Sequence, residues 1–302
     1  MFQLFYAFLW LIAWLPLPVL YLLSDVLFYL VYYVARYRRR VVRKNLTLSF
    51  PEKTAKEILK IERRFYHYFC DLMVETFYLI HISEDEMLRR INFRNLDIIT
   101  DRYKNKKSIM LMTAHYCNWE WVTAMSVLLP AGSPLYGIYK KLSNKNFDKY
   151  MYDQRKKFGG GNIETQELFR TMLKKRSEKE YSTFGMISDQ RPTPESSRHW
   201  MNFLNQDTSC LVGTEQLAKR FNYPVVFLST ERLKRGYYAC DIVLITDNPG
   251  SASDFEITEK YMKLLEQKIV EHPEFWLWTH NRWKFSRNDE KVLNSNHHKN
   301  HE

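Results

Sequence analysis

The sequence contains none of the short glycine motifs that carry nucleotide-binding or serine-hydrolase chemistry. GxGxxG, GxxxxGK[ST] and GxSxG are all absent from its 302 residues. The first two motifs supply backbone amides that hold phosphate groups, and the third presents a nucleophilic serine on a tight turn. The sequence therefore gives no support to a nucleotide-dependent enzyme or to a serine hydrolase of this type.

Cysteine is scarce as well, and its spacing matches neither a metal site nor a disulfide framework. The four cysteines form no CxxC pair: Cys70, Cys117, Cys210 and Cys240. Such isolated cysteines are typical of free, buried thiols on the reducing side of a membrane. Cys117 lies two residues after a histidine, but side chains this close in sequence rarely point at each other, so we expect buried packing rather than a nucleophile.

Acidic residues are outnumbered by basic ones, and aromatic residues are abundant. The formal net charge is +11, the isoelectric point is about 9.3, and aromatic residues make up 16% of the chain. A positive surplus favours anionic partners, which include nucleic acid, anionic lipid and an acidic carrier protein. The aromatic content fits either a membrane interface or a large aromatic core.

Residues 1–35 almost lack charge, with Asp25 as the single charged side chain. A helix needs roughly 20 apolar residues to cross a bilayer core, and this segment is longer. It has no basic start and no small-residue cleavage site, so it does not resemble a signal peptide. Pro16 and Pro18 should interrupt a helix. The segment predicts a membrane anchor, as either one tilted span or an interfacial helical hairpin.

A basic cluster follows the apolar segment directly, and it consists of Arg36, Arg38, Arg39, Arg40, Arg43 and Lys44. The positive-inside rule then places the rest of the chain in the cytoplasm, at the inner membrane. Arg39, Arg40 and Arg43 are candidates to bind anionic headgroups or lipid phosphates, although the cluster can also serve topology alone. Because the basic cluster adjoins the membrane anchor, we do not expect it to bind nucleic acid.

Apolar residues recur near the helical period in residues 51–82, which predicts an amphipathic helix or helix pair. Its aromatic side chains are more typical of a core than of an acyl groove. From residue 92 short apolar strands alternate with helices, which predicts an α/β fold with a mostly parallel central sheet flanked by helices. We expect a membrane anchor (1–35), a basic segment with amphipathic helices (36–91), a catalytic domain (92–285) and a disordered tail (286–302). Three tail histidines give no sign of a metal site.

The strongest candidate for chemistry is His115, which follows the predicted strand 108–114 in the segment TAHYCNWEW. Open α/β sheets place ligands at such strand ends. Asn118 can cap the next helix, which would bring Glu120 across the bend toward His115. Glu120 would then orient the imidazole while its other nitrogen takes a proton from an alcohol. Taken alone, a histidine followed by an acid five residues later is more often structural.

Three further segments carry a resemblance to a known family. They are Asn45-Leu46 with Phe50-Pro51-Glu52, the strand ending in Asp189-Gln190, and the closing segment HPEFWLWTHNRWKF (272–285). Together with the His115–Glu120 spacing, they resemble the bacterial late lipid A acyltransferases, a branch of the lysophospholipid acyltransferase superfamily. The resemblance covers about residues 5–285. Lys140 stands where the family commonly carries an arginine, which keeps the charge but loses the bidentate geometry.

The resemblance implies transfer of a fatty acyl group from acyl carrier protein to a hydroxyl of a lipid A precursor, without a cofactor or a metal. His115 and Glu120 would be catalytic. Lys140 and the first amides of the helix after His115 would stabilise the oxyanion, and Asp189 and Gln190 would position the acceptor or cap a turn. Two alternatives stay open: an acyltransferase acting on another lysophospholipid, ornithine lipid or glycolipid, and a basic membrane-tethered binding protein.

Overall fold

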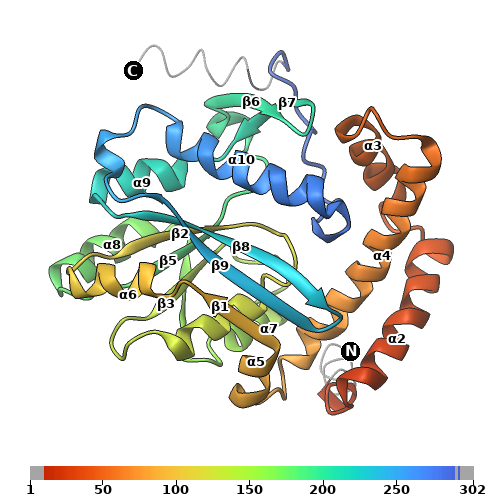
Figure 1. Cartoon of the computed structure of the whole chain (residues 1–302), viewed down its shortest axis with the longest axis horizontal. Coiled ribbons are helices and arrows are strands. Elements are labelled where there is room, and N and C mark those ends of the chain that lie inside the picture. The colour runs from red at the N-terminus through yellow and green to blue at the C-terminus, as the bar shows by residue number, and fades with distance from the viewer. Residues whose placement is uncertain (1–9, 290–291, 293–302) are drawn as a thin grey trace.

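The structure is a computed structural model that describes residues 10–289 and residue 292. Residues 1–9 of the apolar segment and most of the tail that was predicted to be disordered lie outside the described residues. Figure 1 shows a central sheet with helices on both sides, and a stack of N-terminal helices beyond one end of it.

The central sheet has seven strands in the order β1-β9-β8-β2-β5-β3-β4. Every neighbouring pair is parallel except β8 and β9, so the predicted mostly parallel sheet is confirmed. Its strands are β1 (Ile91–Arg94), β2 (Ile109–Thr113), β3 (Leu135–Tyr139), β4 (Gly161–Glu164), β5 (Thr183–Ile187), β8 (Val225–Lys234) and β9 (Tyr237–Thr246). All five residues of β2 are buried, as expected for a central parallel strand.

Helices cover both faces of this sheet. They are α5 (Glu84–Arg90), α6 (Asp97–Lys104), the 3-10 helix η2 (Trp121–Leu128), α7 (Lys145–Arg155), α8 (Leu168–Ser177), α9 (Gly213–Phe221) and α10 (Glu256–Glu271). In Figure 1, α9 and α10 lie on one side of the strands, and α5 and α7 lie on the other. A separate hairpin of β6 (His199–Phe203) and β7 (Gln206–Cys210) packs outside α10.

The turn residues Lys234–Gly236 between two apolar segments predict a hairpin, and β8 and β9 form it, with Gly236 at a φ of +74°. The glycines after residues 144–158 predict a helix end and a turn, and this is wrong at Gly161, which begins β4. The turn itself is at Gly159, where φ is +83°. A Cβ at Gly161 would lie 2.5 Å from the ring of Tyr136, so a glycine lets β4 pair closely with β3.

The N-terminal stack in Figure 1 contains several helices. They are α2 (Leu17–Tyr29), which continues as the π-helix η1 (Leu30–Val34), then α3 (Arg39–Ser49) and α4 (Ala55–Tyr78). α2 begins directly after Pro16, consistent with the expected interruption. A capping box between Thr54 and Glu57 fixes the start of α4.

The N-terminal helix formed by α2 and η1 lies along α4, and three of its hydroxyl groups donate to carboxylates of α4. Tyr21 donates to Glu75, Ser24 donates to Asp71 and Tyr32 donates to Glu62. The outer face exposes large apolar side chains such as Leu22, Val26 and Val34. Residues 17–34 are long and apolar enough to cross a membrane, and a third of this segment is buried against the rest of the chain.

Candidate active site

The site forms where two neighbouring parallel strands end. β2 pairs with β5, and beyond their last residues the amide of Ser188 donates to the carbonyl of Thr113 at 3.1 Å. His115 follows β2 and Asp189 follows β5. Because parallel neighbours end at the same edge of a sheet, residues 74 positions apart in the sequence come into contact.

His115 and Asp189 share a hydrogen bond of 2.8 Å between Nδ1 and Oδ1. The backbone amide of His115 also donates to Oδ2 of Asp189, at 3.1 Å. The carboxylate therefore fixes both the ring and the backbone of the histidine. The side chain of His115 is 20% exposed and that of Asp189 is 2% exposed, so the ring faces outward from a buried acid.

A third donor completes the environment of the Asp189 carboxylate. The indole nitrogen of Trp276 donates to Oδ2 at 2.8 Å. Burial alone would raise the pKa of Asp189, but charge on His115 and the bonds from His115 and Trp276 lower it below its ordinary value. Asp189 is thus held as a carboxylate, which can accept a hydrogen bond from Nδ1–H of the ring.

The second ring nitrogen of His115 faces Gln190. The side-chain nitrogen of Gln190 lies 3.3 Å from Nε2. When the ring is neutral and Nδ1 donates to Asp189, Nε2 carries a lone pair that can accept from the Gln190 amide. This is the tautomer that a general base needs, because the lone pair of Nε2 is directed away from the buried acid.

Glu120 does not hold the ring of His115, which corrects the interpretation of the sequence. Its two carboxylate oxygens accept from Arg155 at 2.7 and 2.9 Å, and one of them also accepts from the indole of Trp119 at 3.2 Å. Burial alone would lower the pKa of Arg155, but Glu120 raises it above its ordinary value. Arg155 ends α7, and no local pattern in the sequence links it to Glu120.

The helix after His115 is the 3-10 helix η2, and Glu120, not Asn118, is the residue at its N-cap position, without a side-chain cap. Asn118 still contacts the start of this helix, because the amide of Trp121 donates to its Oδ1 at 3.2 Å. This amide is therefore occupied, which removes it from the donors expected for an oxyanion. Burial raises the pKa of the Cys117 thiol well above its ordinary value, so the thiol is neutral and is not an activated nucleophile.

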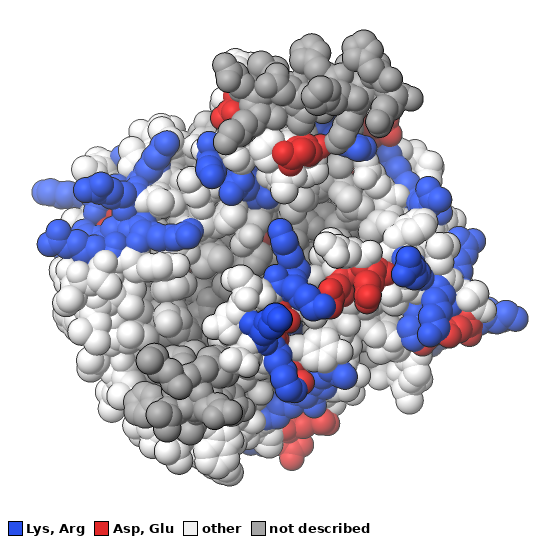
Figure 2. Space-filling view, turned by 180° about the vertical axis from the view of Figure 1, so that it is seen from behind, with Lys and Arg blue, Asp and Glu red and all other residues white. Residues whose placement is uncertain are grey.

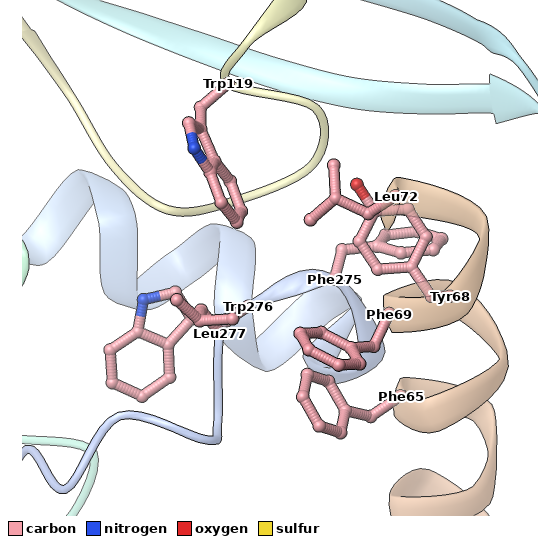
Figure 3. Close-up of a pocket in the computed structure, with 8 residues that line it drawn as sticks. All are labelled: Phe65, Tyr68, Phe69, Leu72, Trp119, Phe275, Trp276 and Leu277. Atoms are coloured by element: carbon pink, nitrogen blue, oxygen red, sulfur yellow. The ribbon is translucent and has the colours of Figure 1, made fainter. Parts of the chain in front are cut away.

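An apolar groove lies beside this site (Figure 3). The space between its lining side chains is narrow and half open, about 160 Å³ with open solvent included, and three segments line it: α4, the loop after His115 and the segment after α10. Its lining residues are Phe65, Tyr68, Phe69, Leu72, Trp119, Phe275, Trp276 and Leu277. Part of the aromatic stripe of α4 therefore faces this groove, whereas Tyr66 is buried in the core.

Two tryptophans connect the groove with the histidine. The ring of Trp119 meets His115 edge to face, with 4.9 Å between the ring centroids. Trp276 lines the groove and donates to Asp189. A chain in the groove would therefore have one end next to the imidazole. The role of Trp276 was not predictable from local patterns, since Trp276 lies 87 residues from Asp189 in the sequence.

The basic residues expected to bind substrate fall into two places. Lys140 is exposed just beyond β3. The three arginines lie together on α3, where Arg39 and Arg43 pair with the buried Glu62, and Arg40 and Arg43 are exposed. Figure 2 shows a cluster of Lys and Arg where α2 gives way to α3, next to a largely uncharged surface along α2.

The closing segment 272–285 braces the site rather than facing outward. Trp278 and Arg282 are buried, and Asn45 of α3 donates to the carbonyls of Trp278 and His280 at 3.0 Å. Two of the segments that carry the family resemblance are thus in direct contact. Within residues 10–289 and 292, no group of three or more His, Cys, Asp and Glu side chains is placed to hold a metal ion.

Comparisons with known proteins agree with the residues assembled here. Residues 1–285 match the family described as bacterial lipid A biosynthesis acyltransferase. The chain is similar to a lipid A biosynthesis lauroyltransferase of Escherichia coli K12, at 24% identity over 91% of this chain and 89% of that protein. It is also similar to a palmitoleoyltransferase of the same pathway and strain, at 22% identity over 91% and 88%.

Proposed function

Because the chain belongs to the family of bacterial lipid A biosynthesis acyltransferases, we propose that it moves a fatty acyl chain from acyl carrier protein to a hydroxyl of a lipid A precursor. The observation that carries this proposal is the position of His115. Its Nε2 is oriented by a buried acid on the other side of the ring, and an apolar groove begins beside it. These are the parts that acyl transfer from a lipid-like donor needs.

In the proposed mechanism, Nε2 of His115 takes the proton of the acceptor hydroxyl, and the alkoxide oxygen attacks the thioester carbonyl carbon. Asp189 stabilises the imidazolium through Nδ1. When the tetrahedral intermediate collapses, the carbon–sulfur bond breaks and the imidazolium returns its proton to the departing thiolate. Gln190 yields its contact with Nε2 to the acceptor hydroxyl and can then hold the acceptor.

Glu120 acts as a positioning residue in this proposal. It anchors Arg155 with two hydrogen bonds and Trp119 with one, and the indole of Trp119 packs against the His115 ring. The Glu120–Arg155 ion pair therefore holds the wall between the histidine and the groove, and it takes no part in the proton transfer itself.

The apolar groove is the proposed binding site for the acyl chain. All eight lining side chains are apolar or aromatic, and four of them come from one helix, α4. Each methylene that leaves water on binding contributes about 0.8 kcal/mol. The groove therefore gives the acyl chain both affinity and a fixed direction, with its carbonyl end beside His115.

We assign membrane binding to the N-terminal helices, and binding of an anionic substrate group to the exposed Lys140. The apolar outer face of α2 lies in the inner membrane, with the domain on the cytoplasmic side. Arg40, together with Arg39 and Arg43 beside it, contacts anionic headgroups. Lys140 contacts an anionic group of the donor or acceptor.

The test compares lipids and purified components. Lipid A from a strain that lacks this gene should be lighter by one acyl chain, and the purified protein should restore the chain when it is given acyl carrier protein thioester and the precursor. If lipid A keeps its mass while an ornithine lipid or a glycerophospholipid loses an acyl chain, the acceptor is that lipid and the lipid A assignment is wrong. If no lipid changes, the acyltransferase mechanism fails as a whole.

A further inference from the structure

A buried carboxylate outside the proposed catalytic groups joins three parts of the molecule. Glu75, on α4, is fully buried. Its Oε1 accepts from the hydroxyl of Tyr21 at 2.7 Å, and its Oε2 accepts from the hydroxyl of Tyr238 and from the side-chain amide of Asn118, both at 2.7 Å. The donors come from α2, from β9 and from the loop after His115.

The bond to Asn118 connects Glu75 to the proposed active site. Asn118 lies between His115 and Glu120, and it is buried. Its Nδ2 donates to Glu75 while its Oδ1 accepts from the amide of Trp121, so both ends of the side chain are used. The indole of Trp121 in turn donates to the backbone carbonyl of Glu75 at 3.2 Å. Glu75 and its own helix therefore hold the loop at two points.

The bond to Tyr21 connects Glu75 to the apolar helix. Arg235 lies in the turn of the β8–β9 hairpin, with its guanidinium carbon 4.4 Å from the centroid of the Tyr21 ring. It also donates to the backbone carbonyl of Tyr21 at 3.2 Å. The neighbouring Gly236 has no Cβ, and a Cβ there would overlap the Tyr21 hydroxyl. The turn is thus shaped to let this hydroxyl reach the buried acid.

We propose that Glu75 is a positioning residue, which holds the loop from His115 to Trp121 in its active arrangement and which depends on Tyr21 of α2 to do so. This inference rests on the proposed function, because it assigns Glu75 a part in the same reaction. It means that docking of the membrane-facing helix and the geometry around His115 are linked through one carboxylate.

The buried Glu75 carboxylate accepts from three donors, and it is sensitive to the loss of any one of them. Burial raises the pKa of Glu75, and the bonds from Tyr238, Tyr21 and Asn118 oppose this shift. With one donor removed, the carboxylate is poorly stabilised and its other partners rearrange. A displacement of about 1 Å at reacting groups can lower a rate by about 100-fold.

The first test uses two tyrosines on the same face of the N-terminal helix. Tyr21→Phe removes the bond to Glu75. Tyr32→Phe removes a bond of 2.9 Å to Glu62 and the acceptor of a 3.4 Å bond from Arg39, and neither of these partners is bonded to the loop. Both variants lose one hydroxyl that donates to a buried carboxylate of α4. We expect Tyr21→Phe to lower kcat by about 10-fold or more and Tyr32→Phe to leave kcat within about 2-fold of the unchanged protein.

The second test exchanges donor and acceptor between Glu75 and Asn118. Glu75→Gln leaves one acceptor oxygen, so the side chain cannot accept from Tyr21 on one side and from Asn118 on the other, and kcat should fall by about 100-fold. Adding Asn118→Asp lets the new glutamine donate to an aspartate that can still accept from the amide of Trp121. We expect the double variant to recover at least about 10-fold in kcat over Glu75→Gln alone.

Hydrogen exchange provides a readout that needs no substrate. In full-length protein, Tyr21→Phe should speed amide exchange in residues 115–121 by about 10-fold, and Tyr32→Phe should not. The inference is overturned if exchange in this loop is unchanged in Tyr21→Phe, if both tyrosine variants lower kcat equally, or if the double variant recovers nothing. A wild-type protein without acyl transfer activity would sink the proposed function, while the exchange result would still decide whether Glu75 holds the loop.

Discussion

Oδ1 of Asp189 lies 2.8 Å from Nδ1 of His115, although the two residues are 74 positions apart in the sequence. The same carboxylate also accepts from the backbone of His115 and from Trp276. In the proposed mechanism it has the role that the spacing in the sequence suggested for Glu120.

Asp189→Asn should lower kcat by about 1,000- to 10,000-fold, because an amide at this position no longer fixes the Nδ1–H tautomer or stabilises the imidazolium. The measurement is single-turnover acyl transfer, with circular dichroism to verify the fold. Gln190→Ala serves as the comparison and should have a milder effect. If Asp189→Asn retains more than a tenth of the activity, Asp189 does not orient the base.

The stability of the protein should depend on Asp189 in acid. Because the folded state lowers the pKa of this carboxyl, the ionised form stabilises the fold at pH values above its ordinary pKa, and this contribution disappears as pH falls through the lowered value. The difference in unfolding free energy between wild type and Asp189→Asn should shrink as the pH falls below about 4. A difference that grows toward acid would contradict the lowered pKa.

Glu120→Ala should destabilise the protein by about 2 kcal/mol, because Arg155 would lose two hydrogen bonds while it stays mostly buried. The double variant Glu120→Ala/Arg155→Ala should be more stable than the sum of the single losses predicts, as expected for residues in direct contact. Denaturant unfolding in detergent measures both effects. Strict additivity would show that the pair is not coupled.

Leu72→Trp should shift the preference of the enzyme toward shorter acyl chains, because it fills part of the groove. Loss of contact with one methylene is worth about 0.8 kcal/mol, or about 4-fold in the ratio of kcat/KM between chains that differ by one carbon. Competition between acyl carrier protein thioesters of different length measures this ratio. An unchanged preference in a folded variant would place the acyl chain elsewhere.

Leu22→Glu and Val26→Glu, on the exposed face of α2, should each weaken binding to lipid vesicles by about 10-fold. Leu173→Glu is a matched control, since Leu173 is also exposed but lies on α8, far from α2 in Figure 1. Co-sedimentation with vesicles that contain anionic lipid gives the binding constants. Equal losses in all three variants would mean that α2 is not the membrane surface.

Features with strong local signals were predictable from the sequence. The apolar run of β2, the hairpin around Gly236 and the long amphipathic helix α4 all lie close to where periodicity and turn residues place them. His115 was found because it follows an unmistakable buried strand. Strands β1, β4 and β6 were missed, because they are only four or five residues long and include polar side chains.

The partner of His115 could not be read from local patterns, because it depends on the order of strands in the sheet. Glu120 is near in sequence, but its side chain meets Arg155, whereas Asp189 is brought to the ring by the pairing of β2 with β5. An isolated antiparallel β-bridge between Tyr116 and Trp276 holds Trp276 next to the site, where its indole donates to the same carboxylate. Strand order follows from packing of the whole chain, which hydrophobic periodicity does not encode.

The most direct test of the account is mass spectrometry of a lipid A precursor incubated with acyl carrier protein thioester and either wild type or His115→Ala. The account predicts that wild type adds the mass of one acyl chain, and that the variant, folded and equally bound to membranes, adds it at least about 1,000-fold more slowly. Acylation by His115→Ala at the wild-type rate would contradict the central claim that this imidazole is the base.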